Sequence, residues 1–294
     1  MQSIYQGDAS QSTGKRITER AGRPARCVIP KHKTMRFDIL TLFPELITPL
    51  LTNGVTRRAY ESGAIEVHLW NPRDHAEGNH RRVDDRPFGG GPGMVMLAEP
   101  LLQCLNAIRA SRHEEIDAQA PLVLFSPTGA LLTHAGVSEW SASPGAILLC
   151  GRYEGVDQRF IDHFVDRQIS LGDFVLSGGE IAAMALLDAV ARLQPGVLND
   201  EGSHRFDSFN PALDGLLDCP HYTRPEVWQG HSVPAPLLSG HHTQIAQWRR
   251  QQSLALTAQS RPELLEKARD QGGLTPKDET FLAAMEAAKA KPGP

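Results

Sequence analysis

Two glycine-rich segments contain the residues of this 294-residue sequence that are best suited to holding a ligand. The first is CGRYEGVD at positions 150–157, and the second is LGDFVLSGGE at positions 171–180. Five glycines punctuate polar and aromatic side chains in these segments, and a glycine lets the backbone approach a ligand closely. The pattern favours a planar ligand such as an adenine, bound largely by main-chain groups. The alternative is that these glycines form ordinary tight turns.

A third glycine-rich stretch, GGGPGM at positions 89–94, lies at the end of a long segment without apolar periodicity. That segment, positions 71–93, is too long for a simple connection, and loops of this length are usually functional. It lacks the G-K-[ST] of a phosphate-binding loop and the G-x-G-x-x-G register of a dinucleotide site. Cationic side chains beside a glycine-rich backbone suit contact with phosphate groups; here they are His80, Arg81, Arg82 and Arg86. The alternative is that Asp84 and Asp85 only pair with these arginines.

The elements expected to position these segments alternate between apolar strands and helices. Strands are predicted at FDILTLF and IEVHLW, and helices at positions 44–62, interrupted near Asn53-Gly54, and at positions 97–111. Three later apolar runs each stop at a glycine-containing turn: PLVLF before SPTG, AILLC before GRYEG, and RQISLGDFVL before SGGE. A helix, IAAMALLDAVARL, follows. This alternation predicts an α/β fold with a mostly parallel sheet. The three turns should meet beyond the carboxyl ends of their strands, where open α/β sheets bind ligands.

The C-terminal part of the chain is expected to be helical. Helical patterns run through HHTQIAQWRRQQSLALTA and RPELLEKARD, and a further helix is predicted from Pro276, with Thr275 as N-cap and Asp278 at N3. The first 34 residues are polar and basic without periodicity, which fits a disordered tail, an upstream start, an RNA-binding arm or a targeting peptide. We expect a disordered extension at 1–34, an α/β domain at 35–195, a flexible linker at 196–210 and a helical domain at 211–294.

Composition limits the classes of function. Hydrophobic residues make up 40% of the chain, and no apolar run approaches the roughly 20 residues that a membrane helix needs. The formal net charge is −4; residues 1–34 hold seven Lys or Arg and two Asp or Glu, which leaves −9 for the rest. RNA binding would therefore use local basic patches rather than a global field. The four cysteines form no C-x-x-C pair and the histidines no zinc spacing, which predicts reduced thiols in a cytoplasmic protein.

Together the motifs resemble those of the bacterial tRNA (guanine-N1)-methyltransferase family, which belongs to the knotted SPOUT methyltransferases. The resemblance spans roughly residues 35–270 and rests on WNPRD, VDDRPFGGGPGM, LFSPTG, CGRYEGVDQR, ISLGDFVLSGGE, DAVARLQPGVL and DSFNPALDGLLDCPHYTRPEVWQG. It implies a SPOUT-type parallel sheet with a deep trefoil knot and a small all-α C-terminal domain. No periodicity argument predicts a knot, because knots are nearly absent among folds.

The resemblance also implies that S-adenosylmethionine is the methyl donor, held by three loops. Carried onto this sequence, the first loop contributes Ser126, Pro127 and Gly129, and the second contributes Gly151, Tyr153, Glu154 and Gly155. The third contributes Leu171, Gly172, Asp173, Phe174, Val175, Leu176, Gly178 and Gly179.

Transfer of a methyl group to N1 of guanosine 37 in tRNA, 3′ of the anticodon, is the reaction that the resemblance implies. It assigns Asp207 as the general base and Arg192 as the group that stabilises charge on guanine O6. It further implies a homodimer whose sites combine both subunits, tRNA bound by the helical domain, and magnesium near Glu154. From the residues alone, the alternative for Arg192 is a cation that only complements the C-terminal end of a helix.

Some positions depart from the family pattern. Phe174 stands where the family often has Tyr, Leu124 stands where an aromatic residue is common, and the linker around Asp207 is less acidic. Any contact through a hydroxyl group at position 174 is therefore in doubt. The competing classes are a related enzyme acting on rRNA or another tRNA position, a non-catalytic RNA-binding module, and a nucleotide-dependent oxidoreductase. The oxidoreductase lacks its dinucleotide fingerprint.

Overall fold

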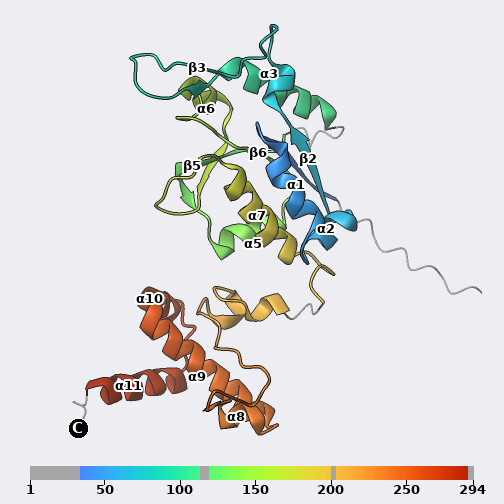
Figure 1. Cartoon of the computed structure of the whole chain (residues 1–294). Coiled ribbons are helices and arrows are strands. Elements are labelled where there is room, and N and C mark those ends of the chain that lie inside the picture. The colour runs from blue at the N-terminus through green and yellow to red at the C-terminus, as the bar shows by residue number, and fades with distance from the viewer. Residues whose placement is uncertain (1–33, 113–118, 200–202, 291–294) are drawn as a thin grey trace, which may run out of the picture. The chain divides into compact units, whose positions relative to one another are not determined.

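The computed structural model describes residues 34–112, 119–199 and 203–290 (Figure 1). The expected N-terminal extension, 1–34, lies outside the described residues apart from Thr34. Within the described part of the chain, none of the helices combines the length and the apolar character that crossing a membrane requires.

A five-stranded sheet, with parallel pairing throughout, forms the centre of the N-terminal part. Its strand order is β2-β1-β6-β5-β7. The middle strand, β6, is buried along its whole length, as expected for a parallel strand covered on both faces. The sheet confirms the predicted α/β class. Its strands are β1 (Met35–Leu40), β2 (Ile65–Trp70), β5 (Leu122–Leu131), β6 (Gly145–Leu149) and β7 (Arg167–Ser170).

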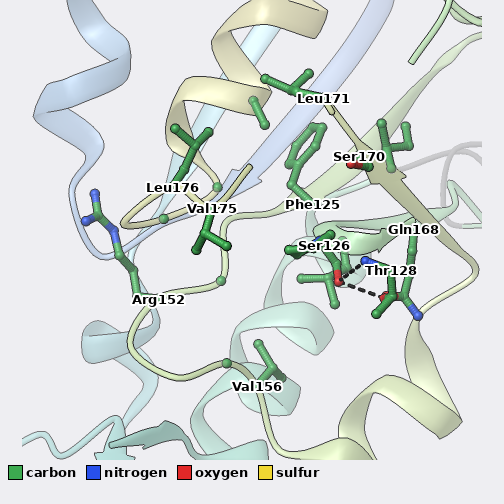
Figure 2. Close-up of a pocket in the computed structure, with 18 of the residues that line it drawn as sticks. Phe125, Ser126, Thr128, Arg152, Val156, Gln168, Ser170, Leu171, Val175 and Leu176 are labelled. Atoms are coloured by element: carbon green, nitrogen blue, oxygen red, sulfur yellow. Dashed lines mark hydrogen bonds between the residues drawn. The ribbon is translucent and has the colours of Figure 1, made fainter. Parts of the chain in front are cut away.

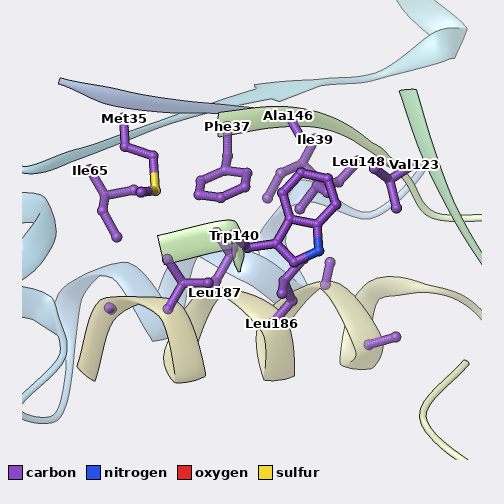
Figure 3. Packing of buried hydrophobic residues seen from close by; sticks show 14 of the residues in the cluster. Met35, Phe37, Ile39, Ile65, Val123, Trp140, Ala146, Leu148, Leu186 and Leu187 are labelled. Atoms are coloured by element: carbon purple, nitrogen blue, oxygen red, sulfur yellow. The ribbon is translucent and has the colours of Figure 1, made fainter. Parts of the chain in front are cut away.

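Helices cover both faces of this sheet (Figure 1). On one face, Leu186 and Leu187 of α7 and Trp140 of α5 pack beneath strand residues that include Phe37 and Leu148 (Figure 3). On the other face, α3 and α6 bury a second cluster against the alternate strand residues. The helices are α1 (Pro44–Thr52), α2 (Arg57–Glu61), α3 (Ala98–Ser111), α5 (His134–Ser141), α6 (Gln158–Phe164) and α7 (Glu180–Arg192). Shorter elements are η1 (Pro72–His75), β3 (Asp84–Asp85) and β4 (Val95–Met96).

Three of the predicted strands differ from the structure by more than one residue at an end. The run FDILTLF, at positions 37–43, was expected to be one strand, but β1 spans Met35–Leu40. The strand expected to stop before SPTG continues to Leu131, and Phe125 and Ala130 both pair with Ile169. The residues between them therefore bulge out of the strand rather than ending it. The run RQISLGDFVL was expected to be one strand, but only Arg167–Ser170 pairs, and the residues that follow form a loop. An apolar run does not by itself show where a strand stops pairing.

The C-terminal part has its own buried cluster, formed by Leu216, Leu254, Leu265, Ala268 and Leu282. The predicted capping box is present, since the Asp278 amide donates to Thr275 Oγ1 at 3.2 Å and the Thr275 amide donates to Asp278 Oδ2 at 2.9 Å. A two-stranded hairpin accompanies the helices, so this part is not purely helical. Its elements are η2 (Ser203–Phe206), η3 (Pro211–Leu213), β8 (Val227–Trp228), β9 (His231–Ser232), α8 (Ala235–Leu238), α9 (His242–Ser260), α10 (Pro262–Asp270) and α11 (Pro276–Ala290).

Candidate functional site

A pocket of about 470 Å³ lies where β5, β6 and β7 lead into their loops (Figure 2). Three segments line most of it: the β5 bulge, the loop after β6 and the loop after β7. Its volume is within the roughly 300–1,000 Å³ that is usual for small-molecule sites. The charged side chains among its lining residues are Arg152 and Glu154. The remaining lining groups are apolar side chains, hydroxyl and amide groups, and main-chain atoms.

The structure brings most of the residues implied as donor-binding into this single pocket. Those that line it are Ser126, Pro127, Gly151, Tyr153, Glu154, Gly155, Leu171, Gly172, Phe174, Val175, Leu176, Gly178 and Gly179. Gly129 and Asp173 do not line it. Sequence reasoning missed Thr128, Arg152 and Gln168, which also line the pocket. Arg152 sits inside the GRYEG motif, so its position in that motif was the available signal.

Several of the glycines are explained by close packing within the protein rather than by room for a ligand. A Cβ on Gly129 would lie 2.4 Å from the Ile169 nitrogen, and one on Gly179 would lie 2.8 Å from Cys150 Cα. A Cβ on Gly178 would lie 2.3 Å from Arg152 Nε. Gly155 differs, because its φ of +140° favours glycine and nothing lies within 4 Å of its absent Cβ. Close packing within the protein therefore accounts for Gly129, Gly178 and Gly179, whereas Gly155 leaves space in which a ligand could approach the backbone.

A chain of polar side chains runs along one wall of the pocket (Figure 2). Ser126 Oγ and Thr128 Oγ1 share a hydrogen bond of 2.8 Å, and Thr128 Oγ1 donates to Gln168 Oε1 at 2.7 Å. Because the Thr128 hydroxyl donates its hydrogen to Gln168, it can only accept from Ser126, so the Ser126 hydroxyl is the donor of that bond. The Gln168 carboxamide therefore has its NH2 group left as the donor on this wall.

The glycine-rich stretch after position 88 is joined to the loop after β6. The Glu154 amide donates to the Met94 carbonyl oxygen at 2.9 Å, and the Met96 amide donates to the Gly155 carbonyl oxygen at 2.9 Å. A Cβ on Gly93 would lie 2.2 Å from Glu154 Oε1, and the φ of +81° at this position also favours glycine. Part of the predicted pairing of Asp84 and Asp85 with the nearby arginines is present, since Arg82 Nη1 lies 3.4 Å from Asp85 Oδ2. Burial and the nearby Asp84 raise the pKa of the Tyr153 phenol, so it stays protonated at neutral pH.

The Arg152 side chain joins two of the pocket loops through a buried carboxylate. Its Nη2 lies 2.9 Å from Oε2 of Glu180, and its Nε donates to Oε1 of the same group at 3.1 Å. Its Nη1 donates to the Ser177 carbonyl oxygen at 3.2 Å. Thr41, just after β1, donates to Glu180 Oε1 at 2.8 Å. The guanidinium carbon lies 4.5 Å from the centre of the Phe43 ring, in the range of a cation–π contact.

The two residues expected to act on the base form an ion pair at the far end of α7. Arg192 Nη2 lies 2.5 Å from Asp207 Oδ2, and both side chains are more than a third exposed. Helix α7 has 13 residues and its first turn reaches the pocket through Ala182. At a rise of about 1.5 Å per residue, the two ends of this helix lie roughly 18 Å apart. The pocket and the Arg192–Asp207 pair are therefore well separated within one copy of the chain.

Metal binding has little support in the geometry. Among the described residues, no group of three or more His, Cys, Asp or Glu side chains is arranged to hold a metal ion. The pocket lining offers one carboxylate, that of Glu154, and Mg2+ is commonly held through only one or two carboxylates together with waters.

Comparison with known proteins decides the family. A family model described as tRNA (Guanine-1)-methyltransferase TrmD matches residues 35–267. A tRNA (guanine-N(1)-)-methyltransferase of Polaromonas sp. (strain JS666 / ATCC BAA-500) is 73% identical over 251 residues, which is 85% of this chain and 97% of that protein. Proteins of the same name from Leptothrix cholodnii and Bordetella pertussis are 61% and 57% identical, over 86% and 85% of this chain and 100% and 98% of theirs. The chain belongs to the tRNA (guanine-1)-methyltransferase family.

As a member of the tRNA (guanine-1)-methyltransferase family, the protein is an enzyme that methylates tRNA, and the family implies S-adenosylmethionine as the donor. The matched region begins at the first residue of β1 and ends within α10. It therefore contains the pocket, the Arg152–Glu180 contact and the Arg192–Asp207 pair. The competing interpretations as an oxidoreductase or a non-catalytic RNA-binding module are excluded by this match.

Proposed function

We propose that the enzyme transfers the methyl group of S-adenosylmethionine to N1 of guanosine 37, with Asp207 as the general base and Arg192 as the partner of O6. The observation that carries these roles is the Arg192–Asp207 ion pair. A carboxylate and a guanidinium held side by side match the N1–H and O6 groups that lie side by side on one edge of guanine. A cation that only complemented a helix end would need no such carboxylate partner.

The pocket fits the donor by its chemistry. Backbone groups of the glycine loops and the Gln168 carboxamide suit an adenosine, and a wall with little net positive charge suits a sulfonium. When bound, S-adenosylmethionine supplies an activated methyl group, so the enzyme needs no covalent nucleophile. The residues that would hold it are Gly151 and Gly155 after β6, and Leu171, Val175 and Leu176 after β7.

The work left to the protein is proton removal and charge stabilisation. Asp207 takes the N1 proton, and the nitrogen electron pair that this frees forms the new bond to the methyl carbon. The guanidinium of Arg192 donates to O6, where negative charge collects as the proton leaves. The existing ion pair keeps the carboxylate oriented before substrate arrives. The products are N1-methylguanosine, the neutral thioether of the donor and a proton.

We propose that the working site combines two copies of the chain. The roughly 18 Å length of α7 keeps a donor in the pocket away from the Arg192–Asp207 pair of the same copy. A second copy would supply that pair. Large apolar side chains that do not line the pocket are exposed close to it in the chain, which suits a subunit interface; these are Phe43, Leu46 and Ile181.

We also propose a knotted donor-binding domain and a separate tRNA-binding domain. The loop after β7 shares the pocket with both neighbouring loops, and the Gly179 amide donates to the Gly151 carbonyl oxygen at 3.0 Å. These contacts hold the loops against one another, as the trefoil knot that we propose from the family would require. The separate C-terminal core supports a domain at 211–294, joined by the linker 196–210, that would hold the anticodon stem. Glu154 is the carboxylate of the pocket lining that would contact a magnesium ion, and we derive no step through that ion.

The test is incubation of the enzyme with labelled S-adenosylmethionine and unmodified tRNA carrying guanosine at positions 36 and 37, followed by nucleoside mass analysis. We expect N1-methylguanosine at position 37. A matched tRNA with adenosine at position 37 is the control and should take up no label. Label at another nucleotide of the first tRNA would contradict the proposed target.

A further inference from the structure

We infer that Glu180 is a positioning and specificity residue of the donor pocket: by neutralising Arg152, it keeps the pocket wall receptive to a cationic methyl donor. This inference rests on the proposed donor pocket. Its basis is that the sulfonium of the proposed donor and the guanidinium of Arg152 are both positively charged. A pocket that holds a sulfonium should not present a free guanidinium, yet Arg152 lines the pocket.

The geometry resolves this contradiction. The Glu180 side chain is 1% exposed and the Arg152 side chain 16% exposed, and the carboxylate lies against Nε and Nη2 of the guanidinium. In Figure 2 the Arg152 side chain extends away from Ser126 and Thr128 on the opposite wall. A carboxylate so deeply buried is costly unless it is paired. The pairing leaves Glu154 as the uncompensated charge of the lining, and its sign suits a sulfonium.

The same contact also fixes the loops mechanically. Arg152 lies in the loop after β6, whereas Ser177, which accepts from its Nη1, lies in the loop after β7. Thr41 ties the carboxylate to the end of β1, and its own Oγ1 accepts from the Phe43 amide at 2.9 Å. Three strand ends therefore converge on one carboxylate. A role in holding the loops alone would affect every ligand of the pocket equally, whereas charge compensation would not.

Two ligands that differ mainly in charge separate the two roles. S-adenosylmethionine carries a sulfonium, and S-adenosylhomocysteine is the same molecule with a neutral thioether. Glu180→Gln leaves the guanidinium in place without its counter-charge. We expect its affinity for S-adenosylmethionine to fall by about tenfold more than its affinity for S-adenosylhomocysteine. The double variant Arg152→Gln/Glu180→Gln removes both charges and should restore the wild-type ratio of the two affinities, even if both affinities are weaker.

A surface pair of the same chemistry provides the control. Glu139 lies 2.7 Å from Arg167, whose guanidinium carbon lies 5.3 Å from the centre of the Trp140 ring. Glu139→Gln removes the same charge outside the pocket and should leave both affinities unchanged. Titration calorimetry gives the affinities, and thermal unfolding shows that each variant is folded.

The outcomes distinguish this inference from the proposed function. An equal loss for both ligands in Glu180→Gln, or a ratio that the double variant does not restore, would overturn the charge role. The donor site itself is tested by Val175→Trp, because Val175 lines the pocket and is 85% exposed, so the larger ring has room without disturbing the core. If Val175→Trp binds S-adenosylmethionine as the wild type does, the pocket assignment fails instead.

Discussion

Gly178→Ala tests how tightly the donor pocket depends on the Arg152–Glu180 contact. The new Cβ would lie 2.3 Å from Arg152 Nε and 2.5 Å from Glu180 Oε2, distances at which the side chains must separate. Breaking a buried ion pair costs roughly 3–5 kcal/mol. Arg152 is 16% exposed and regains water when displaced, so we expect about 2–3 kcal/mol. At roughly 2–4 °C per kcal/mol for a chain of this size, Tm should fall by about 4–12 °C.

The assay combines thermal unfolding with calorimetric titration of S-adenosylmethionine. Because the displaced guanidinium lies in the pocket wall, we expect weaker donor binding together with the lower Tm. Gly63→Ala is a control, since Gly63 has a positive φ of +74° but nothing within 4 Å of its absent Cβ; it should lose stability through backbone strain alone and keep its donor affinity. A Gly178→Ala variant with wild-type Tm and affinity would refute the packing role assigned to this glycine.

Three other variants test separate parts of the account. Asp207→Asn keeps the size of the side chain but removes its basicity, and should lower the single-turnover rate constant of methyl transfer at least about 100-fold while donor affinity persists; equal loss of both would make Asp207 a structural residue. Gly129→Ala places a Cβ 2.4 Å from the Ile169 backbone, which cannot move like a side chain, so chemical denaturation should show a loss of more than about 3 kcal/mol. Burial raises the pKa of the Cys104 thiol from 9.0 to about 12, so stability is unaffected by this group below pH 9.0 and falls as pH rises toward about 12. Cys104→Ala should flatten that decline in urea titrations, and an unchanged slope would contradict it.

Much of the fold follows from local patterns. The strands β2 and β6 and the helix α7 match the predicted apolar runs to within one residue, β1 overlaps its predicted run, and Thr275 and Asp278 form the predicted capping box. The strand ends were less predictable, because β5 continues through a bulge that only its pairing with β7 reveals. Local sequence carries no information about that partner.

For the site, too, the sequence predicted local features but not the long-range contacts. The glycine motifs predicted a pocket at the strand ends, and the structure has one there. They did not predict which glycines are forced by packing, since Gly178 is crowded by Arg152 as well as Glu180, and Gly129 is crowded by the backbone of β7. The hydrogen bond from Thr41 to Glu180 spans 139 residues, so no spacing rule could have found it. The methyl donor and the guanine target were predicted by resemblance to a family rather than by the residues' own chemistry.

The central claim is that the donor pocket of one subunit works with Asp207 of the other. It is tested most directly by mixing two inactive variants, Val175→Trp, which blocks the pocket, and Asp207→Ala, which lacks the base. Unfolding and refolding them together in equal amounts makes about half of the dimers mixed, and each mixed dimer has one complete site. The account predicts recovery of about a quarter of wild-type activity. No recovery from mixed dimers that are shown to have formed would contradict it, because the base and the pocket would then belong to the same subunit.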